Sequence, residues 1–321
     1  AQVLADARLS HPKRSSSCRE RALPIDLEEE AHARGIPEGG QRGRREFGFS
    51  DSGHRQFRLC QYIVGSSLRG VILRPFIVES TSCASYLFGC TSKGLLAVVD
   101  PHVDLVDRYL ETAASIGSPI AAVFETHVQA DHVSGLPALV ERTGATPYLP
   151  EHAGVGFDHH PLADGDVIEL GNTVVTTIAT PGHAPAHIAL SVADRRRGTL
   201  DPWLVFTGDS LLVGDVGRPD LHAHGDAEPL ARTLYGSVQR LLQLGDDVVV
   251  YPSHIGGSVC GRGLSSNPFS SIGFERRHNE ALQHEDEEAF ARALLVDVPP
   301  PPVGQAEIVA ANRSGRSYQA A

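Results

Sequence analysis

The sequence lacks several features that would assign it to a common class of protein. None of its 321 residues is methionine, and no apolar stretch approaches the roughly 20 residues of a transmembrane helix. No charged segment followed by an apolar one opens the chain, so we expect no secretory signal. The net charge of −11 is opposite to the basic excess of nucleic-acid-binding proteins. We therefore expect neither a membrane protein nor a nucleic-acid binder, and a cytoplasmic location.

Cysteine is scarce and scattered. The five cysteines are odd in number and form no C-x-x-C pair; they are Cys18, Cys60, Cys83, Cys90 and Cys260. In a chain of this size, that distribution predicts reduced thiols rather than a disulfide framework.

The chain divides by composition. Residues 1–68 are polar, rich in glycine and arginine, and show no period of 2 or 3.6. They are predicted to form a disordered or loosely attached arm. Residues 69–315 are predicted to form one domain, and residues 316–321 a short tail.

Within the domain, apolar periodicity predicts a mixture of strands and helices. The helices are expected at residues 103–116, 134–143 (with Ser134 as N-cap), 230–244 and 285–295, and regular structure is expected to end at residues 299–302. The strands are expected at residues 71–78, 84–88, 94–100, 119–124, 148–149, 167–170, 174–179, 188–192, 203–206 and 248–251. Gly171-Asn172 supplies a hairpin turn. Such a pattern predicts an α/β fold of four layers, two sheets face to face with helices outside.

Four candidate ligands share one local signature: an apolar strand, then a small or chain-breaking residue, then the ligand. They are His127, His183, Asp209 and His254. Any one of them alone is most simply a polar residue satisfied in a loop, but four repeats at strand ends favour a metal site at one edge of the sandwich. With Asp131 and His132, which share the turn of His127, they offer only nitrogen and oxygen donors. Such a set suits zinc, iron or manganese.

Four segments carry a resemblance to a known family. They are residues 127–132 (HVQADH), 180–183 (TPGH), 206–209 (FTGD) and 251–254 (YPSH). In this order they resemble the motifs of the metallo-β-lactamase superfamily, and the branch of glyoxalase II and persulfide dioxygenases fits best. The resemblance covers residues 71–315. It implies an αββα sandwich with the metal at one edge.

One position departs from the pattern H-x-H-x-D-H of the superfamily, because Gln129 stands where the second histidine is expected. The residues left for the first metal are His127, His183 and Asp209. Two imidazoles and one carboxylate form the facial triad of non-haem Fe(II) oxygenases. The resemblance to persulfide dioxygenases implies that these three are the catalytic and metal-binding residues, with one Fe(II) per chain. Gln129 would then bond to a metal-bound water, or serve as an amide ligand that still permits zinc.

Three other candidate ligands fit two interpretations. In a two-metal hydrolase, Asp131, His132 and His254 would build a second metal site together with Asp209. In an iron enzyme they would form hydrogen-bonded partners around the metal ligands. The remaining histidines of the loops are not expected to be ligands; they are His152, His159, His160, His187, His222 and His224.

Two further segments offer candidate substrate-binding residues. Residues 212–221 resemble the G-R-x-D segment of persulfide dioxygenases, and Arg218 and Asp220 are expected to pair and lock this loop or to contact substrate. Residues 256–263 are similar to bacterial persulfide dioxygenases that are often fused to a rhodanese domain. There Arg262 is expected to favour the thiolate of Cys260, which would hold or pass a sulfane sulfur. A buried inert thiol is the alternative.

The predicted function is oxidation of a low-molecular-weight thiol persulfide, such as glutathione persulfide, with O2 to sulfite and thiol on one iron. The alternative is a zinc hydrolase of the glyoxalase II type acting on a thioester or lactone. A sulfurtransferase of the rhodanese type is a possible partner, and a homodimer is the default assembly.

Overall fold

The structure is a computed structural model that describes residues 70–315 except 224, 259, 285, 299 and 302. These residues belong to one structural unit, Ile63–Ala321. The second unit, Ala1–Tyr62, and with it almost all of the predicted arm, lies outside the described residues. The predicted tail at residues 316–321 also lies outside them.

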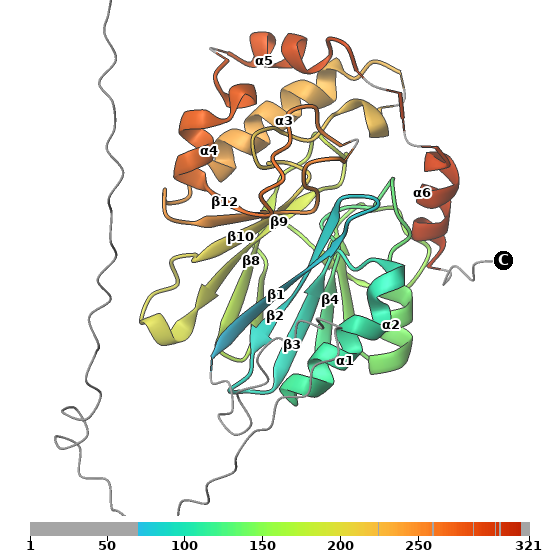
Figure 1. Ribbon diagram of the computed structural model, residues 1–321, viewed down its shortest axis with the longest axis vertical. Coiled ribbons are helices and arrows are strands. Elements are labelled where there is room, and N and C mark those ends of the chain that lie inside the picture. The colour runs from blue at the N-terminus through green and yellow to red at the C-terminus, as the bar shows by residue number, and fades with distance from the viewer. Residues whose placement is uncertain are drawn as a thin grey trace, which may run out of the picture. The chain divides into compact units, whose positions relative to one another are not determined.

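Two six-stranded sheets form the centre of the fold (Figure 1). The first follows chain order, with β1 to β3 antiparallel and β3 to β6 parallel. Its strands are β1 (Val71–Val78), β2 (Cys83–Cys90), β3 (Leu95–Val99), β4 (Ile120–Phe124), β5 (Thr146–Pro150) and β6 (His160–Leu162). In the second sheet only β10 and β11 are parallel. Its order is β12 (Ser270–Ser271), β11 (Val249–Pro252), β10 (Leu204–Gly208), β9 (Ile188–Asp194), β8 (Thr173–Ala179) and β7 (Val167–Leu170).

Helices cover the outer face of each sheet. The first sheet carries α1 (Val106–Ile116) and α2 (Leu136–Thr143), whose apolar residues pack against buried residues of β1 to β4. The second sheet carries α3 (Glu228–Leu241), α4 (Ile272–His278) and α5 (Glu287–Leu294). Strand β2 shows the result, since all eight of its residues are buried. The four-layer αββα sandwich predicted from the sequence is therefore confirmed.

Aromatic residues fill the space between the sheets. Phe88 of β2, Phe124 of β4 and Phe206 of β10 are fully buried there, and the rings of Phe88 and Phe206 lie 5.0 Å apart. Each such ring stabilises the fold by about 1.5–3 kcal/mol through burial alone. This closely packed centre holds the strand ends, and the loops that follow them, in fixed positions.

Two predicted helix starts differ in detail from the structure. The helix expected from residue 103 begins as a 3-10 turn, η2 (Val103–Leu105), because the His102 side chain accepts a hydrogen bond from the Asp104 amide. Ser134 was predicted to be the N-cap of α2, but Gly135 occupies that position. The Ser134 hydroxyl still accepts a hydrogen bond from the Leu136 amide at 2.9 Å.

The prediction that regular structure ends at residues 299–302 is wrong, because α6 (Gln305–Ser314) follows. None of the described side chains of α6 is buried, which agrees with the weak apolar periodicity of its sequence, QAEIVAANRS. In Figure 1 it stands apart from the helices that cover the sheets. The short elements β6, β12 and α4 were also not predicted. Among the described residues, no helix combines the length and apolarity needed to span a bilayer.

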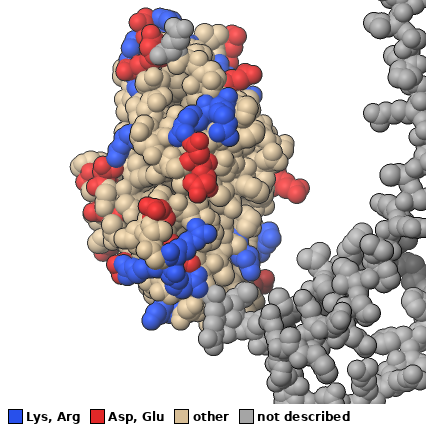
Figure 2. Space-filling model, turned by 90° about the vertical axis from the view of Figure 1, so that its left-hand side faces the viewer, with Lys and Arg blue, Asp and Glu red and all other residues tan. Residues whose placement is uncertain are grey.

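The loops that carry the candidate ligands meet at one edge of the sandwich. They follow β4, β8, β10 and β11. Isolated β-bridges join His127 to His187 and Cys83 to His254, so main-chain pairing continues beyond the strands. On the face shown in Figure 2, Lys and Arg side chains are interspersed with Asp and Glu.

Candidate metal centre

His127 follows β4 and is fixed by a chain of hydrogen bonds. Its Nδ1 lies 3.0 Å from Thr126 Oγ1, and the Thr126 hydroxyl donates to the Asp100 carboxylate at 3.0 Å. Nδ1–H of His127 therefore donates to the hydroxyl, and Nε2 carries the free lone pair. Burial, and then the neighbouring His183, hold the pKa of His127 well below its usual value. The imidazole is neutral, which is the form that binds metals.

His183 presents the same nitrogen. Its Nδ1–H donates to the Arg218 carbonyl at 2.9 Å, which leaves Nε2 as the acceptor. This Nε2 lies 3.4 Å from Asp209 Oδ2. Asp209 Oδ2 is buried and has no hydrogen-bond partner among the described residues. Because burial also lowers the pKa of His183, two electron-rich atoms face each other there, an arrangement that fits a cation between them.

The T-G-D segment fixes Asp209. The Asp209 amide donates to His187 Nε2 at 3.1 Å, and His187 Nδ1–H donates to Thr180 Oγ1 at 2.8 Å. Gly208 has φ +52°, and a Cβ there would lie 2.6 Å from both His187 Nε2 and Thr126 Oγ1. Only glycine meets both requirements. His187, which the sequence did not indicate as a ligand, thus orients one.

Burial alone would raise the pKa of Asp209, but the imidazoles of His254 and His183 outweigh it and hold the carboxylate ionised. Two neutral imidazoles and this carboxylate form a donor set that fits Fe(II) or Zn(II). His222, for which the sequence gave no ligand role, also lies here. The ligand nitrogens of His127, His183 and His222 are within 4.8 Å of one another.

The side chains expected around the triad come together beside it. His254 Nδ1 lies 2.7 Å from Asp209 Oδ1, and His254 Nε2 lies 2.6 Å from Asp131 Oδ2. Asp131 Oδ1 in turn lies 3.0 Å from His132 Nδ1. Burial would lower the pKa of His254, but the carboxylates of Asp131 and Asp209 raise it well above its usual value. His132 Nε2 is buried without a hydrogen-bond partner among the described residues.

Cys83 joins this group and was not predicted. Its Sγ lies 3.4 Å from His254 Nε2 and 3.6 Å from His132 Nδ1. Burial would raise the pKa of the thiol, but the two imidazoles lower it to about 7. Cys83 begins β2, a position with no sign of function in the sequence. It reaches the site because the Ala84 amide donates to the Ser253 carbonyl at 2.7 Å.

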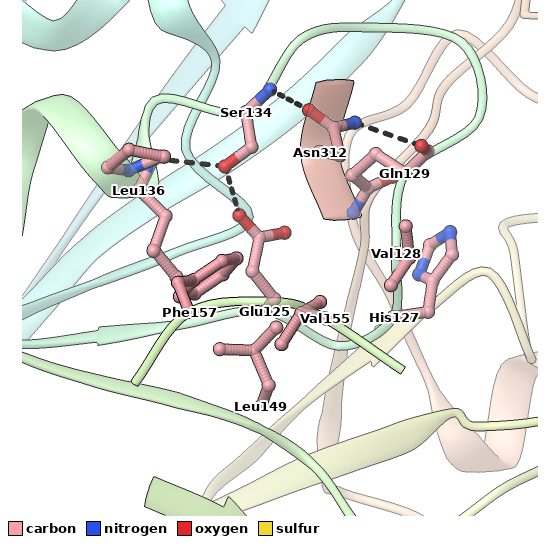
Figure 3. Close-up of a pocket in the computed structure, with 11 residues that line it drawn as sticks. Glu125, His127, Val128, Gln129, Ser134, Leu136, Leu149, Val155, Phe157 and Asn312 are labelled. Carbon is pink, nitrogen blue, oxygen red and sulfur yellow. Dashed lines mark hydrogen bonds between the residues drawn. The ribbon is translucent and has the colours of Figure 1, made fainter. Parts of the chain in front are cut away.

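Gln129, the residue that departs from the family pattern, lines a pocket with His127 (Figure 3). The other side chains of the pocket are mostly apolar and include Leu149, Val155 and Phe157. Both polar atoms of the Gln129 amide are buried without a well-formed hydrogen bond among the described residues, and the amide lies beside the Glu125 carboxyl, whose pKa is raised by burial and lowered in part by this amide. The amide therefore offers a donor and an acceptor next to the candidate metal ligands.

Asn312 of α6 holds the loop that carries these ligands. Its Nδ2 donates to the Gln129 carbonyl at 2.9 Å, and its Oδ1 accepts from the Ser134 amide at 2.9 Å (Figure 3). Nδ2 also donates to the His132 carbonyl at 2.9 Å. The helix absent from the prediction is thus tied to the loop by polar contacts.

The G-R-P-D segment lies against the triad. Arg218 and Asp220 form a bidentate pair with distances of 2.8 and 2.6 Å. A Cβ on Gly217 would lie 1.9 Å from the Asp209 carbonyl oxygen and 3.0 Å from His183 Nδ1. Only a residue without a side chain allows the loop to approach this closely, and that approach lets the Arg218 carbonyl bind His183.

The prediction that Arg262 favours a thiolate at Cys260 is wrong. The Arg262 guanidinium donates to the carbonyls of Val296 and Ala293 instead. Cys260 is buried, and burial raises the pKa of its thiol to about 12. Its Sγ still lies 3.9 Å from Asp131 Oδ2, so the residue borders the site as a protonated thiol.

Comparison with known sequences agrees with this geometry. The sequence profile described as "Metallo-beta-lactamase superfamily" matches residues 80–254, from the end of β1 to the last candidate ligand. The chain belongs to the metallo-beta-lactamase superfamily. The resemblance stated from the four motifs is confirmed.

Three relatives show which branches of the superfamily are similar. "Persulfide dioxygenase ETHE1, mitochondrial" of Homo sapiens is 30% identical over 193 residues, 59% of this chain and 70% of that protein. The crystal structure of ETHE1 from Myxococcus xanthus is 32% identical with a TM-score of 0.66, covering 76% of this chain and 98% of that one. A hydroxyacylglutathione hydrolase of Polaromonas sp. is 36% identical over 174 residues, 53% of this chain and 61% of that protein.

Proposed function

We propose that the protein is a mononuclear non-haem iron persulfide dioxygenase. The observation that carries the proposal is Gln129 in place of a histidine, which leaves His127, His183 and Asp209 as a facial triad. Similarity to persulfide dioxygenases in sequence and in fold supports it. The substrate would be a low-molecular-weight thiol persulfide such as glutathione persulfide. The balanced reaction is RSSH + O2 + H2O → RSH + SO3²⁻ + 2 H⁺.

Bound Fe(II) would supply the redox chemistry between O2 and the terminal sulfur. The chain itself orients the metal-binding side chains and sets their protonation states. Thr126 and the Arg218 carbonyl fix which nitrogen His127 and His183 present. His254 engages one oxygen of Asp209 and leaves the other for the metal. Two neutral imidazoles and one carboxylate leave a divalent ion with a net positive charge, which favours an anionic persulfide.

A zinc hydrolase of the glyoxalase II type is the second candidate. It is supported by Asp131, His132 and His254, which are all present next to Asp209, and by similarity to a hydroxyacylglutathione hydrolase. Gln129 argues against it, since the first zinc would lose one imidazole. The sulfurtransferase partner, the homodimer and the cytoplasmic location stay predictions.

The deciding experiment is metal analysis of protein purified without oxygen, together with oxygen uptake and sulfite formation on adding glutathione persulfide. We expect one iron per chain at the triad and rapid uptake, both lost in H183A and D209A. H278A, an exposed histidine of α4, is the matched control and should change neither. Zinc at the triad, no oxygen uptake and hydrolysis of S-lactoylglutathione would contradict the dioxygenase proposal and show that the protein is a hydrolase.

A further inference from the structure

A third imidazole, that of His222, lies beside the two histidines of the triad. The ligand nitrogens of His127, His183 and His222 are all within 4.8 Å of one another. The ring of His222 lies 5.4 Å from that of His183 at an interplanar angle of 77°, and 6.2 Å from that of His127 at 83°. The rings of His127 and His183 lie 4.9 Å apart at 88°. Three rings that stand nearly perpendicular to one another, with their nitrogens together, can direct those nitrogens at one metal ion.

The segment that carries His222 is fixed to the triad. His222 ends the 3-10 turn η4 (Asp220–His222). The first residue of this turn, Asp220, forms the bidentate pair with Arg218. The carbonyl of Arg218 accepts from His183 Nδ1–H at 2.9 Å. The loop that orients one triad histidine therefore also places His222, four residues further along the chain.

His187 provides a contrast, because it is a nearby histidine that is not arranged as a ligand. Its ring is stacked on that of His127, 5.0 Å away at an angle of 27°. Its Nε2 accepts from the Asp209 amide, and its Nδ1–H donates to Thr180 Oγ1. Both nitrogens are thus used within the protein, and no lone pair is left for a metal. His222 differs in the orientation of its ring, and its nitrogen converges with those of the two triad histidines.

We propose that His222 is a third imidazole ligand of the metal held by the triad. The family pattern has a second histidine where this chain has Gln129, so the metal would otherwise have only two imidazoles. His222 would supply the missing imidazole from a different loop. Four protein ligands still leave two positions of a six-coordinate ion for oxygen and the persulfide sulfur. A neutral imidazole also leaves the net charge of the site unchanged.

This inference rests on the metal at the triad, which is part of the proposed function, but not on the reaction that follows. Three imidazoles and one carboxylate suit both Fe(II) and Zn(II). Metal binding without any substrate is therefore the property to measure.

The test is the affinity of the metal-free full chain for Co²⁺ at the site whose affinity falls in H183A, measured under nitrogen by competition with a chelator. We expect H222L to bind at least about 10-fold more weakly, since even indirect partners of a metal contribute this much. H222E should regain most of the affinity, because a carboxylate can also be a ligand. H278A, an exposed histidine of α4, is the matched control and should bind normally.

Two outcomes would overturn the proposal. One is that H222L binds Co²⁺ as tightly as the unmodified chain. The other is that H222E binds as weakly as H222L, because His222 would then act through packing and not as a ligand.

A measurement on the unmodified protein covers the case in which the variants fail to fold. X-ray absorption of the chain loaded with one equivalent of iron should show three imidazoles around the metal, and two would overturn the proposal. Oxygen uptake together with normal metal binding in H222L would keep the dioxygenase and reject only the role of His222. Three imidazoles without oxygen uptake would do the reverse.

Discussion

His254 Nδ1 lies 2.7 Å from Asp209 Oδ1, and both side chains are completely buried. The contact joins the last family motif to the third. The two oxygens of Asp209 therefore have different environments. Oδ1 is oriented by the His254 imidazole, and Oδ2 faces the candidate metal position beside His183. Partners of this kind around metal ligands commonly account for a 10–100-fold difference in metal affinity.

Replacing His254 by alanine should therefore weaken iron binding at the triad although His254 is not a triad ligand. We expect the iron affinity to fall about 10–100-fold, because Asp209 loses the group that orients it. Competition with a chelator under nitrogen measures the change, with H278A as the control. Unchanged iron affinity in H254A would show that Asp209 is held by its backbone alone.

Thr126 should orient His127 for metal binding, as His254 orients Asp209. In T126V the hydroxyl that accepts from His127 Nδ1–H is lost, and with it the hydroxyl's bond to Asp100, whereas the amide of residue 126 keeps its own bond to that carboxylate. The imidazole can then rotate or change tautomer, and we expect iron affinity to fall about 10–100-fold with little change in fold. T112V on α1 is the matched control, because Thr112 bonds only within its own helix, to the Arg108 carbonyl. Equal losses in both variants would contradict the role of Thr126.

Asn312 should stabilise the ligand loop from a distance in sequence. N312A leaves the Ser134 amide and two carbonyls without their partner, which should cost about 1–3 kcal/mol of unfolding free energy. Thermal unfolding measures the loss, and hydrogen exchange should show faster opening of residues 129–134. E307A, an exposed change in the same helix, should leave both unchanged. If hydrogen exchange of residues 129–134 were as slow in N312A as in the unmodified protein, α6 would not stabilise the ligand loop.

Glu125 should make stability depend on pH. Burial raises its pKa from 4.5 to about 8, so between these values the folded chain holds a proton that the unfolded chain has lost. Stability then falls as pH rises through this window, by about 1.4 kcal/mol for each unit of pKa difference. E125Q resembles the protonated form, so its melting temperature should exceed that of the unmodified protein increasingly from pH 5 to pH 8. E111Q, exposed on α1, is the control. Parallel pH curves for E125Q and the unmodified chain would disprove the buried proton.

The sequence by itself determined the fold class and the ligand segments, because both depend on patterns of residues that are close together in the chain. Alternating and continuous apolar runs specified most strands, and the motifs that contain His127, His183 and Asp209 are each found at the end of one of them. Asp100 directly follows the apolar strand β3 and lacks the small or chain-breaking residue of that signature, so the pattern did not include it.

Only the tertiary structure decided which other residues reach the site. Cys83 arrives through backbone pairing with the segment of His254, and Asn312 through a helix with no buried stripe. Cys260 and Arg262 are neighbours in sequence, yet the guanidinium bonds to the carbonyls of α5 and its C-terminal turn while the thiol is buried. Local sequence patterns determine whether a segment forms a strand, a helix or a loop. Contacts between distant segments, and the burial that sets a pKa, depend on how the segments pack.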